Sequence, residues 1–270
     1  MNFQEVNSLR TNPINKKYQP LELQHKSADK TVIVMPAYNA AKTLEYTFNS
    51  IPMEFIDEVI LVDDGSMDET VAVAKNLGII TIRHPHNAGY GANQKSCYTF
   101  ALSREAEIVV MLHPDGQYDP TIIPQIVEPI INGEADVVLG SRFLNSERPM
   151  AGGMPYYKYF SNRFLTIIEN IVLNQNLSEY HTGYRAYHKR VLETIPYIRN
   201  SNDFIFDQQF LFQAATFGFR IKEIPVGTRY FSDASTISFS RSVHYGISTL
   251  ILSMVYLRHC LGWKSNLFIR

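Results

Sequence analysis

The sequence predicts an α/β fold in which a mostly parallel sheet lies between layers of helices. Three observations lead to this prediction. From residue 31 onwards, short and almost continuous apolar runs rich in β-branched residues recur along the chain. These runs alternate with stretches that have helical spacing, and small, polar or acidic residues stand directly after the runs. This alternation is typical of strands that are buried on both faces and joined by right-handed helical crossovers.

The first half of the chain supplies most of the expected sheet. Apolar runs predict strands at 31–35, 58–62, 79–82, 108–112 and 137–139. Helical spacing between and after these runs predicts helices at 40–51, 68–77, 92–103 and 120–131. Beyond residue 142 we expect a loop, two helices, a strand and a final amphipathic helix at 149–155, 159–172, 207–217, 221–226 and 243–261. The chain is thus divided into a polar N-terminal arm at 1–28, one domain at 29–230 and a helical C-terminal extension at 231–270.

Composition and charge exclude several classes of protein. The chain of 270 residues has 25 basic and 26 acidic side chains, so it lacks the basic excess of a nucleic-acid-binding protein. Its two cysteines, Cys97 and Cys260, provide neither a disulfide framework nor a zinc site. The N-terminus has no signal peptide, and the longest apolar stretch, from Tyr245 to Leu257, is too short to cross a bilayer. We therefore expect a cytoplasmic protein.

Polar residues that follow the strands are the candidates for a binding site. They stand at 36–39, 63–66, 84–87, 113–117 and 140–142. In parallel sheets, ligands bind beyond the carboxyl ends of the strands, so these five segments are expected to meet at one site.

Two adjacent carboxylates, Asp63 and Asp64, follow the second strand. Neighbouring Ser66 and Asp68 have the character of a turn and a helix cap, which is the structural interpretation. Two adjacent carboxylates repel each other unless a partner relieves the repulsion. A nucleobase N–H or a ribose hydroxyl is such a partner, which is the functional interpretation.

A second acidic turn runs from His113 to Pro120. Asp119 and Pro120 have the spacing of a helix cap followed by an N-terminal proline. Asp115 and Gln117 place side-chain oxygens on the turn itself, which suits Mg²⁺ or Mn²⁺ with substrate phosphates. The alternative is a polar loop without an ion.

The glycine-containing segment 87–93 is not a dinucleotide-binding motif. It follows the third strand instead of the first, and it lacks the third glycine at the required spacing. The phosphate-binding lysine motif and the Gly-x-Ser-x-Gly motif of hydrolases are also absent from the sequence. A dehydrogenase is therefore disfavoured, and a tight turn into a helix is the simplest interpretation.

Taken together, six motifs resemble those of family 2 glycosyltransferases, in the same order along the chain. They are Val34-Met-Pro-Ala-Tyr-Asn39, Val62-Asp-Asp-Gly-Ser66, Asn87-x-Gly-x-Gly91, Asp115-Gly-Gln-Tyr-Asp-Pro120, Gly140-Ser-Arg142 and Thr182-Gly-Tyr-Arg185. The chain is most similar to the branch of polyprenyl-phosphate (dolichol-phosphate) mannose and glucose synthases, over roughly residues 30 to 230. The resemblance implies a GT-A fold, a nucleotide-sugar donor, a divalent metal and inversion at the anomeric carbon.

The resemblance also implies roles for individual residues. The donor would be held by Pro36, Tyr38, Asn39, Asp63, Asp64, Gly91 and Asp115. Asp115 matches the second acid of the family's Asp-x-Asp metal motif, with Gln117 beside it, whereas His113 replaces the first acid. Imidazole is a poorer ligand for Mg²⁺ than for Mn²⁺. Arg142 and Arg185 match positions near the sugar and the phosphates.

The acceptor decides whether a general base is required. A lipid phosphate is already an anion and needs none, whereas a glycan hydroxyl must lose a proton to a carboxylate. Asp207 matches the family position for such a base, while Asp203 and Glu179 are weaker candidates. The apolar face of the terminal helix is expected to be core or a homo-oligomer contact. The alternative is a peripheral membrane contact, with Arg241, Arg258, Lys264 and Arg270 near acidic headgroups.

The sequence therefore predicts an inverting, metal-assisted glycosyltransferase. It would move a hexose from a UDP- or GDP-sugar to a polyprenyl phosphate or a glycan hydroxyl, with Mg²⁺ or Mn²⁺ as cofactor. One alternative is a nucleotide-sugar-binding module without catalysis, because His113 and Gln209 stand where the family often has acids. The other is a sugar-phosphate nucleotidyltransferase, although the glycine-rich basic loop typical of that class is absent after the first strand.

Overall fold

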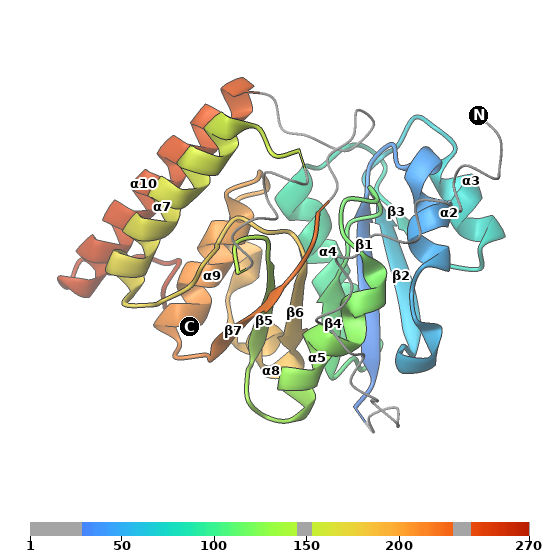
Figure 1. Ribbon diagram of the computed structural model, residues 1–270, viewed down its shortest axis with the longest axis horizontal. Coiled ribbons are helices and arrows are strands. Elements are labelled where there is room, and N and C mark those ends of the chain that lie inside the picture. Colours follow the sequence, from blue (N-terminus) through green and yellow to red (C-terminus); the bar gives the residue numbers. More distant parts are fainter. Residues whose placement is uncertain (1–28, 145–152, 229–238, 270) are drawn as a thin grey trace.

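The computed structural model describes residues 29–144, 153–228 and 239–269, and Figure 1 shows their arrangement. The predicted arm at 1–28, most of the predicted loop at 149–155 and the first part of the predicted extension lie outside the described residues.

A seven-stranded sheet in the order β3-β2-β1-β4-β6-β5-β7 forms the centre of the fold. Six strands run in the same direction, and β6 is antiparallel to both of its neighbours, β4 and β5. The prediction of a mostly parallel sheet is confirmed. The bounds are β1 Thr31–Ala37, β2 Glu58–Asp63, β3 Ile80–Arg83, β4 Ile108–Met111, β5 Val137–Ser141, β6 Arg185–His188 and β7 Ile221–Pro225.

Both faces of the sheet are buried, which explains the apolar runs in the sequence. Along β1, Val32 and Val34 belong to one core cluster, whereas Ile33 and Met35 belong to the other. Successive side chains of a strand point to opposite faces, so a strand buried on both faces must be apolar at every position. The helices that contribute to the first cluster include α4 Tyr90–Ser103, α8 Lys189–Thr194 and α9 Phe206–Thr216. Those that contribute to the second include α2 Ala41–Asn49, α3 Thr70–Asn76 and α5 Ile123–Ile131.

Local signals at the helix ends have the structural roles that the sequence indicates. Asp119 caps the short 3₁₀ helix η4 (Pro120–Ile122), because its side chain accepts a hydrogen bond from the Thr121 N–H at 3.0 Å. Gly218 follows α9 with a φ of 75°, which a glycine adopts without the steric cost of a Cβ. Two further 3₁₀ helices are η3 Met53–Phe55 and η5 Tyr197–Arg199.

The antiparallel strand β6 and the helix α8 were not predicted from the sequence. The strand reads Arg-Ala-Tyr-His, so it contains no aliphatic run that would mark a buried strand. Ala186 and Tyr187 are nevertheless fully buried within it. Only the pairing with β4 and β5 reveals this strand.

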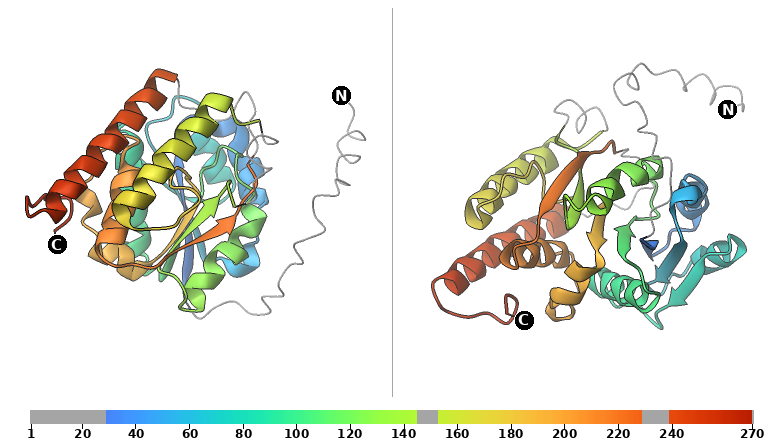
Figure 2. Two further views of the ribbon diagram at one scale, coloured as in Figure 1. Left: turned by 60° about the vertical axis from the view of Figure 1, so that its left-hand side comes forward. Right: turned by 90° about the horizontal axis from the view of Figure 1, so that it is seen from below.

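Two long helices, α7 (Tyr156–Leu173) and α10 (Phe239–Cys260), pack against each other and against α9 on one side of the sheet (Figures 1 and 2). Both expose large apolar side chains. On α7 these are Tyr156, Tyr157, Phe160, Phe164, Ile167 and Ile171, and on α10 they are Val243, Ile247, Ile251, Met254 and Leu257. None of the helices described here is long and apolar enough to cross a membrane.

Candidate active site

A cavity of about 1040 Å³ opens at the carboxyl ends of β1, β2, β4 and β5 and extends to a groove between α7 and α10. Four of the five predicted post-strand segments contribute Pro36, Asp64, Asp115 and Arg142 to its wall, and Asn87 comes from the fifth. The expectation that these segments meet is therefore confirmed. The predicted site residues that line the cavity are Pro36, Tyr38, Asn39, Asp64, His113, Asp115, Gln117, Arg142 and Asp207.

Asn39 organises one end of the cavity from the turn after β1. Its φ of 51° lies in the left-handed region, which asparagine tolerates better than most residues. Its backbone N–H donates to the Ser66 hydroxyl at 2.8 Å, and its side-chain oxygen accepts from the Met67 N–H at 2.9 Å. The turn after β1 is thus fixed to the turn after β2, and Tyr38 stays 47% exposed beside it.

The two adjacent carboxylates have different surroundings. Asp64 lines the cavity, but its oxygens accept hydrogen bonds from the backbone N–H groups of Ala88 and Gly89 at 2.9 and 3.0 Å. His84 Nδ1 lies 2.7 Å from one of these oxygens. Asp64 therefore holds the loop between β3 and α4 in place. The repulsion between Asp63 and Asp64 is therefore relieved in part by groups of the protein, namely the backbone N–H groups and the imidazole that contact Asp64.

Asp63 is fully buried and is not among the residues that line the cavity. Its Oδ2 accepts from the Ser66 N–H at 3.0 Å and lies 3.5 Å from Arg83 Nε. Within the described part of the chain, its Oδ1 is a buried atom without a hydrogen-bond partner. A buried acceptor without a partner is costly, so this oxygen marks a position where a donor group would be stabilising.

Asp115 sits on the turn after β4, with one carboxylate oxygen accepting from the Gln117 N–H at 3.0 Å. Burial raises the pKa of Asp115, and the nearby His113 partly opposes this shift. A buried, charged carboxylate is poorly solvated, so a cation bound beside it lowers its free energy. Asp115 therefore has the properties of a ligand for a positive ion.

His113 is held in one orientation by aromatic packing. Its ring stacks on that of Tyr90, with centroids 5.7 Å apart and an angle of 8° between the planes. A Cβ on Gly183 would lie only 2.8 Å from the His113 ring, so a side chain at position 183 would displace the imidazole. Burial lowers the pKa of His113 against the opposing charges of Asp115 and Asp207, which favours a neutral imidazole.

The hydrogen bonds around Tyr90 identify the imidazole nitrogen that is left for a ligand. The Tyr90 hydroxyl donates its single proton to Asp207 Oδ2 at 2.7 Å. His113 Nε2 lies 3.3 Å from the same hydroxyl oxygen, so the imidazole must be the donor in that contact. This fixes the proton of neutral His113 on Nε2 and leaves the lone pair on Nδ1.

The donor set fits a divalent cation that shares its coordination with a substrate. Across the described ranges, no group of three or more His, Cys, Asp or Glu side chains is arranged to hold a metal by itself. The turn after β4 instead offers one carboxylate, one neutral imidazole and one amide, from Asp115, His113 and Gln117. Mg²⁺ and related ions commonly bind one or two carboxylates together with substrate phosphates.

Asp207, at the start of α9, is engaged at both carboxylate oxygens. Besides the bond from Tyr90, Gln94 Nε2 donates to its Oδ1 at 3.0 Å. Arg185 Nη1 lies 3.5 Å from the same oxygen. Protonation of the carboxylate would weaken these contacts, because a neutral carboxyl group is a poorer acceptor and no longer forms an ion pair with Arg185.

Arg185 lies behind Asp207 and is 1% exposed. Its guanidinium donates to the backbone carbonyls of Thr182, Tyr180 and Asp207 at 2.7, 3.1 and 3.1 Å. The arginine thus organises the segment between α7 and β6 and is not among the residues that line the cavity. Its direct contact with a donor stays a prediction.

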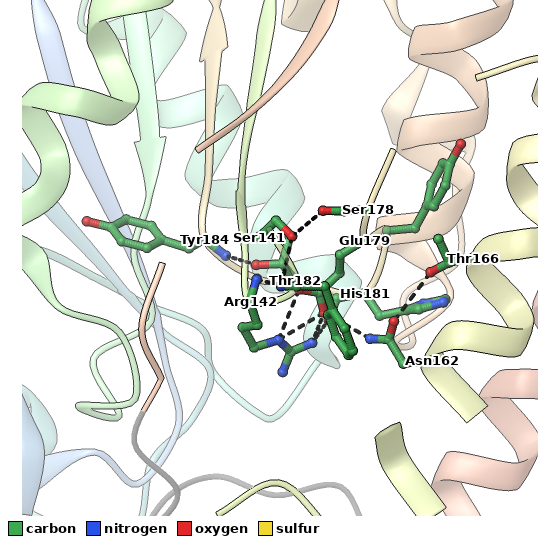
Figure 3. Close-up of polar contacts among 12 residues, drawn as sticks. Ser141, Arg142, Asn162, Thr166, Ser178, Glu179, His181, Thr182 and Tyr184 are labelled. Atoms are coloured by element: carbon green, nitrogen blue, oxygen red, sulfur yellow. Dashed lines mark hydrogen bonds and ion pairs between the residues drawn. The ribbon is translucent and has the colours of Figure 1, made fainter. Parts of the chain in front are cut away.

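Arg142, which follows β5, lines the cavity and pairs with Glu179 (Figure 3). The Glu179 carboxylate accepts from the Arg142 backbone N–H at 2.8 Å, from its guanidinium, and from Asn162 Nδ2 at 2.9 Å. Burial acts to raise the pKa of Glu179, but the charge and hydrogen bonds of Arg142 outweigh it and lower that pKa. Glu179 is therefore a partner of Arg142, and it does not line the cavity.

Gly91 also lies outside the cavity lining, although we predicted it as a donor-binding residue. A Cβ at this position would meet the Ser201 carbonyl oxygen at 2.4 Å and Phe206 Cβ at 2.8 Å. Its N–H donates to the Asn202 carbonyl at 2.7 Å. The glycine is explained by close packing of the loop before α9 on the start of α4, and donor contact through it stays a prediction.

Lys158, on the first turn of α7, is a cavity residue that the sequence analysis did not single out. Burial, followed by the charge of Arg142, lowers its pKa. Among the described residues it has no ion-pair partner. Two cations, Lys158 and Arg142, therefore face the same part of the cavity with only one of them neutralised by a carboxylate. This part of the cavity is suited to an anion.

The far end of the cavity is the α7–α10 groove, which we define by six of the residues that line it, Phe164, Leu165, Val243, Gly246, Ile247 and Leu250. None of the six carries a polar side chain. Ser161, Asn162, Arg241, Ser242 and Tyr245 of the same helices also line the cavity. The groove is continuous with the cavity that contains His113 and Asp115. Tyr90, Gln94, Lys158, His181 and Tyr245 were all missed at this site, because only the packing of distant segments brings them together.

Comparison with known proteins agrees with this geometry. The model of the Glycosyl transferase family 2 matches residues 32–196, which is more than half of the chain, so the protein belongs to that family. A UDP-N-acetylglucosamine–dolichyl-phosphate N-acetylglucosaminyltransferase from Methanococcus voltae is 28% identical over 75% of this chain and 87% of its own length. A polyprenol monophosphomannose synthase from Mycolicibacterium smegmatis is 24% identical over 74% of this chain and 78% of its own.

Solved structures support the fold. Glucosyl-3-phosphoglycerate synthase from Mycobacterium tuberculosis, in complex with Mn²⁺, UDP and phosphoglyceric acid, superimposes with a TM-score of 0.66. The match covers 84% of this chain and 78% of that chain at 18% sequence identity. The predicted GT-A fold and the predicted glycosyltransferase activity are confirmed by the family and fold matches together.

Proposed function

We propose that this glycosyltransferase moves a hexose from a UDP- or GDP-sugar onto the phosphate of a polyprenyl phosphate at a membrane surface, with inversion and with Mg²⁺ or Mn²⁺. The observation that carries the proposal is the continuity between the cation-lined cavity and the α7–α10 groove. The cavity would fit an amphipathic anion, with its charged head beside Lys158 and Arg142 and its apolar tail in the groove.

The state of Asp207 favours a phosphate acceptor over a glycan hydroxyl. A hydroxyl acceptor needs a general base, and the carboxylate at the expected position already accepts from Tyr90 and Gln94 and pairs with Arg185. A phosphate acceptor is an anion that attacks without losing a proton. Asp207 then serves as a positioning residue that fixes Tyr90 and, through it, His113.

The donor would lie along the turns after β1, β2 and β4. We expect Pro36, Tyr38 and Asn39, which line the cavity, to face the nucleoside. Among the described residues, the buried Asp63 Oδ1 has no hydrogen-bond partner, so a nearby N–H or O–H group of the nucleoside would be stabilising. Asp115, with Gln117 and His113 beside it, would hold the divalent ion on the donor's diphosphate. When bound, that ion supplies charge stabilisation for the departing diphosphate.

The protein's own residues then have separate roles in the transfer. Asp115 would hold the divalent ion that binds the diphosphate, and His113, fixed by Tyr90, offers its Nδ1 lone pair on the same turn. Arg142 and Lys158 attract and orient the acceptor phosphate, whose oxygen attacks the anomeric carbon as the bond to the diphosphate breaks. Attack from the side opposite the leaving group inverts that carbon. The apolar walls of the groove limit competing water.

The charges on α7 and α10 favour an anionic membrane surface as the source of the acceptor. The only acidic residue of the two helices, Glu169, is fully buried. Their basic residues are Lys158 and Arg241, which line the cavity, and Arg163 and Arg258, and both helices carry the exposed apolar side chains described above. A helix with apolar and basic faces binds at the interface of acidic bilayers. The same charges would repel in a dimer formed through this surface, so we favour the membrane over a homo-oligomer contact.

The proposal is tested with purified protein, a panel of UDP- and GDP-hexoses, Mn²⁺ or Mg²⁺, and polyprenyl phosphate in vesicles. A sugar-labelled product that extracts into organic solvent is the expected result for at least one donor. Donor binding without transfer to any acceptor would favour the non-catalytic module. Pyrophosphate release from a sugar phosphate and a nucleoside triphosphate would favour the nucleotidyltransferase.

Two variants in the same turn separate the metal role from a structural role. Asp115→Asn removes the carboxylate that faces the cavity, and we expect transfer to fall by at least about 10²-fold. Asp119→Asn replaces the helix cap four residues later and is the matched control. It should keep nearly full transfer, since asparagine is also a good N-cap.

A further inference from the structure

Four side chains beside the α7–α10 groove form a polar cluster that the transfer chemistry does not use, and two of them, His181 and Tyr245, also line the cavity. They are Glu169 on α7, His181 before β6, Gln208 on α9 and Tyr245 on α10. We call them the linking cluster, because one side chain comes from each of the three helices and the fourth from the segment that precedes β6.

The contacts of the cluster form a connected network. Gln208 Nε2 donates to the Tyr245 hydroxyl oxygen, and both the Tyr245 hydroxyl and Gln208 Nε2 lie 2.8 Å from His181 Nδ1. His181 Nε2 lies 3.1 Å from Glu169 Oε2. The backbone carbonyl of His181 accepts from Arg142 Nη2 at 2.7 Å. His181 thus connects the positions of α7 and α10 to the guanidinium that faces the acceptor end of the cavity.

The cluster is incompletely satisfied. The 3.1 Å separation between His181 and Glu169 is an ion-pair distance but not a hydrogen bond. Within the described part of the chain, both Glu169 oxygens, His181 Nε2 and Gln208 Oε1 are buried without a hydrogen-bond partner. Buried polar atoms normally have partners, so a second arrangement that satisfies them would compete with this one.

The groove and the cluster share the same two helices. Leu165 in the groove lies one helical turn before Glu169, and Gly246 in the groove directly follows Tyr245. A Cβ on Gly246 would lie 3.8 Å from Leu165 Cδ1, so the helices approach closely beside the cluster. An apolar chain in the groove would contact the same two helices, so a shift of α7 relative to α10 on binding would change the Glu169–His181 geometry.

We propose that His181 is a positioning residue that couples occupation of the α7–α10 groove to the placement of Arg142. This inference rests on the proposed function, since the occupant is the apolar tail of the phosphate acceptor. In the occupied state the linking cluster becomes fully hydrogen-bonded and holds Arg142 where it meets the acceptor phosphate. A long acceptor should therefore have a higher kcat and a lower KM than a short acceptor that does not fill the groove.

The test compares a long polyprenyl phosphate with geranyl phosphate, using the wild-type chain, Tyr245→Phe and Glu169→Gln. The first variant removes one hydroxyl, and the second removes the charge at the other end of the cluster. Tyr256→Phe is the matched control, because Tyr256 lies on the same helix and packs on Phe212 and Phe268, outside the cavity.

We expect wild type and Tyr256→Phe to show a higher kcat, by about tenfold or more, and a lower KM with the long acceptor. Both cluster variants should keep the difference in KM, because the groove is intact, and lose the difference in kcat. The coupling is disproved if the variants retain the kcat difference, if they lose both differences together, or if wild type shows none. Absence of transfer to either phosphate by wild type would instead contradict the proposed function.

Discussion

The hydroxyl of Tyr90 donates to the Asp207 carboxylate at 2.7 Å, and this bond joins the start of α4 to the start of α9 beside the cavity. It uses the only proton of Tyr90 and occupies an oxygen of the residue expected to act as a base. The same bond fixes the tautomer of His113 on the turn that we propose to bind a metal ion. This one contact is therefore relevant to two proposals, the type of acceptor and the ligands of the ion.

Asp207→Asn should preserve transfer to a phosphate acceptor. The amide oxygen can still accept from Tyr90, but Arg185 loses its ion-pair partner, and breaking a buried pair costs about 3–5 kcal/mol. We expect a clearly lower Tm and a fall in kcat of less than about tenfold when transfer is assayed well below that Tm. A loss of about 10²-fold or more at an unchanged Tm would identify Asp207 as a general base.

His113→Asp should change the metal preference of the turn. A second carboxylate replaces a neutral imidazole, and carboxylate oxygen suits Mg²⁺ better than imidazole does. We expect the affinity for Mg²⁺ in the presence of UDP or GDP to rise relative to that for Mn²⁺ by about tenfold. Calorimetry of metal binding measures this without turnover. An unchanged Mg²⁺ to Mn²⁺ ratio would place His113 outside the coordination sphere.

Glu179→Gln should destabilise the protein in a pH-dependent way. The folded-state pKa of Glu179 is lowered, since Arg142 outweighs the effect of burial. A group with a lowered pKa contributes stability that is present above its unfolded value, here 4.5, and is lost as the pH falls through the folded value.

Chemical unfolding of wild type and Glu179→Gln measures this difference. At pH 7 the variant should be less stable by about 3–5 kcal/mol, because the Arg142 guanidinium keeps its charge but loses the buried carboxylate that neutralises it. The gap should narrow as the pH falls below 4.5. Lys222→Gln is a suitable control, since its pair with Glu134 is about half-exposed at both side chains and should contribute little. A gap that does not depend on pH would show that Glu179 has no such role.

Ile171→Glu should weaken binding to acidic vesicles. Ile171 is 76% exposed on α7, and a carboxylate there adds a repulsive charge to an apolar contact surface. Trp263, the single tryptophan of the chain, is 66% exposed just after α10 and reports on this surface.

We expect the wild-type emission of Trp263 to shift to shorter wavelength on vesicles with anionic lipids, and the shift to weaken with added salt. Ile171→Glu should lose most of the shift. Met67→Glu, at an exposed apolar position near the turn after β2, should keep it. If neither wild type nor Met67→Glu responds to acidic vesicles, α7 and α10 do not contact the membrane.

The sequence was sufficient to predict six of the seven strands, because the signal for each of them is local. The runs at β1, β2 and β4 are apolar at almost every position, which only a strand buried on both faces requires. The antiparallel strand β6 lacks this signal, since Arg185, Tyr187 and His188 are polar or amphipathic. It is defined by pairing with strands that are distant in the sequence.

The candidate site was predictable as a set of turns but not as a set of contacts. Pro36, Asp64 and Asp115 line one cavity because parallel strands end at one edge of the sheet. That Asp207 is paired with Tyr90, more than a hundred residues away, follows only from the packing of α4 against α9. For the same reason, no local pattern distinguishes Arg185, which supports backbone carbonyls, from Arg142, which lines the cavity.

The most direct test of the central claim offers the wild-type chain a polyprenyl phosphate and the corresponding polyprenol side by side. Both have the same apolar tail, and only the first has the anion that Lys158 and Arg142 are expected to bind. With a donor and metal that support turnover, we predict sugar transfer to the phosphate and none to the alcohol. Transfer to the polyprenol or to a glycan hydroxyl, with the phosphate unreacted, would contradict the account.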